Sequence, residues 1–143
     1  MINTPAELKA RYPYQFSGPI IYMSFARGWF QTFVQLCDDI DVTLGENKHG
    51  FHWTQLKEKF GVVRAYYQLE PGFSDREPVL REKLMQLKNT AEAKTSRICA
   101  ACGDPGKVDP KTGWLIALCP MHRAQQLDGK LDSIWLEDHE AGS

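Results

Sequence analysis

The chain has 143 residues, of which 43% are hydrophobic and 11% aromatic, with 17 basic and 18 acidic side chains. This composition excludes general disorder and predicts a single domain over residues 1–143 that buries a core. The sequence has no apolar run of eighteen residues and no charged-then-apolar leader. We therefore expect a cytoplasmic protein with no membrane attachment.

The first forty residues predict two helices. Thr4-Pro5-Ala6-Glu7 is a capping box with proline at the first helical position, and Pro13 ends the short helix expected over residues 5–11. Proline and glycine break any period in residues 12–23, which we expect to form an ordered, aromatic-rich loop. Residues 27–40 predict the main core helix. Their apolar side chains recur at helical spacing on one wide face: Trp29, Phe30, Phe33, Val34, Leu36, Cys37 and Ile40.

The middle of the chain predicts a β-hairpin and a further helix. Aromatic and β-branched residues indicate strands over 51–56 and 62–69, joined by residues 57–61, in which Gly61 can adopt a positive φ. Leucines repeating at helical spacing after Pro78 predict a helix that runs to about Thr95. The fold class predicted is α+β: a core of helix, β-hairpin and helix, followed by a cysteine-containing segment.

That segment has the ligand spacing of a zinc site. Cys99-x2-Cys102 and Cys119-x2-His122 are separated by sixteen residues, and each pair supplies two ligands from one tight turn. The cysteines could instead be small buried hydrophobes, or the first pair a redox motif. Three Cys and one His within 24 residues favour one structural Zn²⁺. Four protein ligands leave no open position for a substrate or a catalytic water.

The predicted site is a Cys3His zinc ribbon or treble-clef-like knuckle over residues 97–123. Turn-forming residues between the ligand pairs suit short hairpin strands that end in residues 114–118. No flexible linker precedes the knuckle, so we expect it to dock on the helices. An acidic tail, residues 124–143, follows it.

The remaining titratable residues carry no recognisable catalytic motif. Cys37 is expected to be a core thiol, His49 a turn residue, His52 a strand residue and His139 a solvated residue of the tail. Residues 118–122 faintly resemble part of an HNH endonuclease, but residues 103–118 contain neither the His nor the Asn that its chemistry needs. We predict that the protein is not an enzyme, while a site assembled from distant residues stays open.

The charge distribution supports a nucleic-acid hypothesis. Residues 94–123 carry five basic and two acidic side chains, although part of this excess offsets the charge of three zinc-bound thiolates. The hairpin adds Lys57, Lys59 and Arg64. The candidate nucleic-acid-binding or partner-binding residues of the zinc segment are Lys107, Lys111, Trp114 and Arg123.

The acidic tail contains an apolar stripe. Leu127, Leu131, Ile134 and Trp135 recur at helical spacing, which predicts a helix with one apolar face. This helix either folds back onto the core, or places Trp135 in a groove of a partner or of a second copy of the chain, giving a homodimer.

Three segments together resemble a known family. Gly28-Trp29-Phe30, residues 55–67 and the pattern from Cys99 to His122 with Gly113-Trp114 are similar to small uncharacterised proteins encoded by bacteriophages and prophages. The resemblance covers residues 28–122 and brings no assigned activity. It implies a phage-type protein in a bacterial host, and such proteins without catalytic machinery often inhibit or modulate host complexes, defence systems included. We therefore expect a host-protein inhibitor, with nucleic-acid binding through the knuckle as the alternative.

Overall fold

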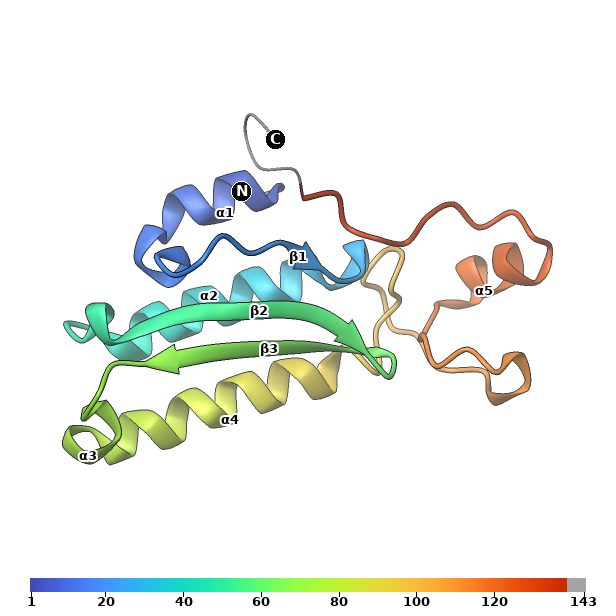
Figure 1. Ribbon diagram of the computed structural model, residues 1–143. Coiled ribbons are helices and arrows are strands. Elements are labelled where there is room, and N and C mark those ends of the chain that lie inside the picture. Colours follow the sequence, from blue (N-terminus) through green and yellow to red (C-terminus); the bar gives the residue numbers. More distant parts are fainter. Residues whose placement is uncertain (139–143) are drawn as a thin grey trace.

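A three-stranded sheet forms the centre of the computed structural model, which describes residues 1–138 (Figure 1). Strands β2 (Phe51–Lys59) and β3 (Val62–Leu69) pair antiparallel, and the short strand β1 (Met23–Ser24) pairs parallel with β2, in the order β1-β2-β3. With the helices described below, this confirms the predicted α+β class. The sequence did not predict β1, since two residues are too short to show an alternating pattern.

Helix α2 (Phe30–Leu44) packs on the inner face of this sheet and buries its apolar side. Its Phe33 ring lies 5.2 Å from Trp53 of β2, centroid to centroid. The helix is preceded by a 3-10 turn, η2 (Arg27–Trp29), and continues four residues beyond the predicted end at Ile40. Cys37 is fully buried here, the core position expected from its spacing. Helix α1 (Pro5–Arg11) forms as predicted, with the Thr4 hydroxyl accepting from the backbone of Glu7.

Helix α4 (Pro78–Lys94) runs alongside β3 (Figure 1). The outward backbone N–H groups of Val63 and Ala65 donate to the Thr95 hydroxyl (3.0 Å) and the Glu92 carboxylate (2.9 Å). These side chains accept hydrogen bonds from the free edge of β3, which could otherwise pair with another strand. The short helices are α3 (Phe73–Arg76), η1 (Pro13–Phe16), η3 (Lys48–Gly50) and η4 (Pro110–Thr112).

The hairpin turn is tighter than the sequence predicts. Strand β2 continues to Lys59, so residues 57–59 belong to the strand and only Phe60 and Gly61 form the turn. Both have positive φ, 56° for Phe60 and 82° for Gly61. Two residues of this kind match the right-handed twist of the flanking strands.

The tail prediction is wrong about the helix. Helix α5 (Pro120–Leu127) ends before Gly129, whose φ is 70°, and residues 130–138 form an extended segment that we call the C-terminal strap. The strap folds back onto the core: Arg27 N donates to Ile134 O (2.6 Å), and Leu136 N to Phe25 O (2.9 Å). Ile134 is only 3% exposed. Backbone pairing with residues 25–27 therefore prevails over the helical spacing of the apolar side chains.

The strap is also held by charge. The Asp138 carboxylate accepts from the backbone of Met23 (2.7 Å) and pairs with Lys9 (3.4 Å). His139 lies outside the described residues. No helix within residues 1–138 is long and apolar enough to cross a membrane.

Candidate metal centre

The structure brings the four predicted ligands together. One ligand atom from each of Cys99, Cys102, Cys119 and His122 lies within 4.8 Å of every other. The His122 Nδ1 atom is 3.4 Å from Cys99 Sγ and 3.2 Å from Cys119 Sγ, while Cys102 Sγ and Cys119 Sγ are 3.9 Å apart. Two sulfurs bound tetrahedrally at about 2.3 Å from zinc would lie roughly 3.8 Å apart. The cluster thus has the size and donor set of a tetrahedral metal site.

The first pair lies on a tight turn after α4. Gly103, with φ 83°, lets the chain reverse, and its N–H donates to Cys99 O (2.7 Å). The Ala101 N–H points at Cys99 Sγ (3.4 Å). Such donors favour a thiolate, the form of cysteine that binds a metal.

The second pair belongs to the start of α5. Cys119 is the N-cap, Pro120 occupies the first turn, and the Cys119 sulfur accepts from His122 N (3.5 Å). Of the two predicted forms, zinc ribbon and treble-clef-like knuckle, a ligand turn facing a helix N-terminus matches the second. The short hairpin strands expected before Cys119 are reduced to isolated backbone pairs. These are Lys107 with Leu118 (3.1 and 3.0 Å) and, around the first ligand pair, Ile98 with Pro105.

The surroundings of the thiols shift their pKa values in opposite directions. Burial by itself would raise the pKa of Cys99, but the backbone N–H groups of Cys119, Ala101 and Cys102 outweigh it and lower the pKa below its ordinary value. Burial and the neighbouring sulfurs of Cys99 and Cys119 raise the pKa of Cys102 to about 12. Three thiolates this close repel one another, so a bound cation is the partner that stabilises all three.

The knuckle rests against the turn before α2. Gly28 N donates to Ala100 O (2.7 Å), and Arg27 Nε to Ala101 O (2.9 Å). On the other side, Gly61 of the hairpin turn meets Leu115: a Cβ added at Gly61 would lie 2.8 Å from the Leu115 carbonyl carbon. The metal segment, residues 97–123, thus contacts both η2 and the hairpin tip, and Figure 1 shows it beside the end of the sheet.

The other candidate residues, Lys107, Lys111, Trp114, Arg123 and Trp135, have different surroundings. Arg123 donates to the backbone carbonyls of Lys107 (3.1 Å) and Ile116 (3.0 Å), so its guanidinium braces the segment. Trp114 is half-buried against the core, whereas Lys107 and Lys111 are exposed. Trp135 is 45% exposed on the strap, and it lines a surface hollow together with Trp114.

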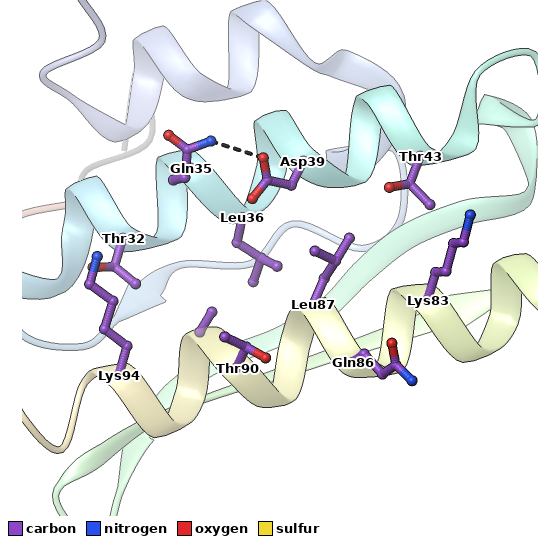
Figure 2. Close-up of a pocket in the computed structure, with 11 residues that line it drawn as sticks. Thr32, Gln35, Leu36, Asp39, Thr43, Lys83, Gln86, Leu87, Thr90 and Lys94 are labelled. Carbon is purple, nitrogen blue, oxygen red and sulfur yellow. Dashed lines mark hydrogen bonds between the residues drawn. The ribbon is translucent and has the colours of Figure 1, made fainter.

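A surface hollow lies elsewhere, between α2 and α4. It has a volume of about 470 Å³, with Leu36 and Leu87 between the helices and Lys83 and Lys94 towards its ends (Figure 2). Asp39 is the carboxylate in its lining, and it accepts from Gln35 (2.9 Å). Within residues 1–138, the lining therefore contains no pair of carboxylates of the kind used in acid–base catalysis.

The structure places His52 in the sheet and the backbone of His49 in a short 3-10 helix. His52 is a half-buried strand residue paired with Gln68, as predicted, and His49 lies in η3. Sequence reasoning missed Phe60 and Tyr66. The alternation of β3 could have placed Tyr66 on the same face as Arg64.

Comparisons with protein-family models, curated proteins and solved structures found no match to this chain. The resemblance to the phage and prophage family therefore stays a prediction.

Proposed function

We propose that this protein is a small, non-enzymatic, zinc-stabilised protein that binds a protein complex of a bacterial host and modulates or inhibits it. The metal centre supports a structural role, because all four tetrahedral positions are supplied by side chains. Three sulfurs and one imidazole are a donor set that favours zinc over harder cations. Cys99, Cys102, Cys119 and His122 would hold the ion, which would then fix the knuckle and α5 and leave no position for a substrate.

The observation that carries the binding proposal is Phe60. Its side chain is 69% exposed at the hairpin tip, on a backbone with φ 56°. Asn, Asp or Gly is the usual residue in such a turn, and a bulky aromatic there costs about 1–3 kcal/mol. An exposed ring kept in a strained turn has the features of an anchor for a partner's pocket.

Leu115 extends this anchor. It is 53% exposed and packs through its backbone against Gly61, next to Phe60. We call Phe60 and Leu115 the tip patch. Because Leu115 belongs to the metal segment, zinc would hold one half of the patch in place, which relates the structural metal to binding.

The identity of the target rests on the resemblance of residues 28–122 to small phage and prophage proteins. In that setting the partner is a cytoplasmic host complex, with a bacterial defence system as the expected case. Binding of a host protein through Phe60 and inhibition of that protein are therefore tested separately, and binding is tested first.

Affinity capture from bacterial lysate, with and without nuclease, tests this proposal. The wild-type protein is expected to retain a host protein after nuclease treatment, and Phe60→Asn to lose it. Val42→Asn is the matched control, because Val42 is 79% exposed on α2, away from the tip. Capture of the same proteins by Phe60→Asn, or capture of nucleic acid alone, would contradict the proposal. Elemental analysis should give one zinc per chain.

A further inference from the structure

The outward face of the β2–β3 hairpin is cationic. Alternate residues of a strand share a face, and the pairs Lys57 with Arg64 and Lys59 with Val62 lie opposite α2. Lys88 of α4 extends this surface across the β3 edge, because its ammonium lies 5.5 Å from the centre of the Tyr66 ring. The basic face, as we call it, consists of Lys57, Lys59, Arg64, Tyr66 and Lys88.

Exposed aromatic rings lie among these cations. Tyr66 is 39% exposed, and Lys57 lies 5.7 Å from its ring centre, so ammonium groups approach this ring from both β2 and α4. Tyr22 is 46% and Trp135 45% exposed. Two surface hollows share Ser24 and Lys57 in their linings; Tyr22 lines one and Trp135 the other. Lys57 thus lies close to the Tyr66 ring and shares one hollow with Tyr22 and another with Trp135.

Carboxylates offset only part of this charge. Glu92 is 6% exposed and pairs with both Arg64 (3.5 Å) and Lys88 (3.7 Å). Among the described residues, no carboxylate forms an ion pair with Lys57 or Lys59, and their ammonium groups lie 5.7 Å from the Tyr66 ring centre and 5.4 Å from the Phe60 ring centre, respectively. Glu58, near the end of β2, accepts from Gly61 N (2.9 Å) and lines the hollow that contains Lys57 and Trp135. The face keeps a positive balance.

We propose that the basic face binds single-stranded nucleic acid, an activity separate from the protein contact assigned to the tip patch. The four cations match a phosphate backbone, and exposed rings stack on unpaired bases whatever their sequence. An acidic protein surface would neutralise the lysines but would offer no stacking partner to the rings of Tyr22, Tyr66 and Trp135. In a duplex the bases are paired and stacked on one another, so their faces are not accessible to these rings. The binding surface is therefore the sheet face and not the zinc knuckle.

Fluorescence anisotropy with a labelled 20-nucleotide oligothymidylate at low salt tests this assignment. Tyr66→Ala should weaken binding about tenfold or more with an unchanged salt slope, while Tyr66→Phe keeps wild-type affinity. Lys57→Ala with Arg64→Ala should weaken binding and reduce the salt slope by about 1.4, since each phosphate contact on a single strand contributes about 0.7.

The matched control removes two charges from the zinc segment. Lys107→Ala with Lys111→Ala should change the affinity less than about twofold, because a screened charge outside the contact contributes little. Absence of binding would overturn the assignment, as would equal losses in the two double variants or unchanged affinity in Tyr66→Ala. Displacement of the oligonucleotide by polyglutamate at equal charge would indicate an acidic protein ligand instead. Capture of a host protein through Phe60 is unaffected by each of these outcomes.

Discussion

Replacing Gly28 by alanine tests how the metal segment is held on the core. An added Cβ would lie 2.7 Å from the carbonyl carbon and oxygen of Ala100, and nearer still to the carbonyl oxygen of Cys99. These are backbone atoms of the ligand turn, so no side-chain rotation relieves the overlap. The turn and the start of α2 must move apart.

The cost follows from that movement. Ordinary contact begins at 3.4 Å, so Ala100 must move by at least about 0.7 Å and Cys99 by more. Such a shift lengthens the Gly28 N–Ala100 O bond from 2.7 Å and the Arg27 Nε–Ala101 O bond from 2.9 Å. Two lost hydrogen bonds, with their groups left partly unsatisfied, cost about 3–4 kcal/mol. For a chain of this length, that lowers Tm by roughly 10 °C.

The assay is thermal unfolding, read together with the zinc retained against a chelator. Gly113→Ala is the control: Gly113 also lies in the metal segment, with φ 70° and nothing within 4 Å of an added Cβ. It should cost only about 1–2 kcal/mol from the left-handed backbone. Equal and small Tm losses in the two variants would refute the idea that close approach at Gly28 fixes the knuckle.

Three further predictions use the same measurements. Cys102→Ser should lose zinc and unfold the segment after α4, because binding energy at a structural site is also folding energy; a wild-type thermal midpoint would contradict this. Phe60→Asn should raise the free energy of unfolding by about 1 kcal/mol by relieving the turn, and a destabilised variant would show that the ring packs inward. Ile134→Ala should lower the free energy of unfolding by about 2–4 kcal/mol, whereas Leu127→Ala, at a residue that is 65% exposed, should lower it by less than about 0.5 kcal/mol. Equal effects of the two variants would mean that the strap is not docked in solution.

Local signals account for what the sequence could predict. Thr4 caps α1 because its hydroxyl reaches an N–H three residues on, a contact set by the chain itself. The four metal ligands were predictable for the same reason, since each pair lies within one turn of chain. The secondary structure of the hairpin strands and of α4 could be predicted from the spacing of apolar residues alone.

What the sequence could not predict depends on distant backbone partners. Strand β1 exists because Met23 and Ser24 meet β2. The end of the chain fits two hydrophobic periods at once. Leu127 of α5 with Leu131 and Ile134 of the strap fits a helix, while buried Ile134 followed by exposed Trp135 fits a strand. The pairing with residues 25–27 decides between them. Likewise, Arg123 looked like a free cation until the carbonyls of Lys107 and Ile116 were seen to accept from it.

The two proposed surfaces differ in how much they depend on the metal. Leu115 of the tip patch belongs to the metal segment and contacts Gly61, so loosening the knuckle removes half of that patch directly. The basic face is held from the other side, where Thr95 and Glu92 bond the edge of β3 to α4. A metal that orders the knuckle would therefore control protein contact at the tip more strongly than nucleic-acid contact on the sheet, even though the two surfaces share one hairpin.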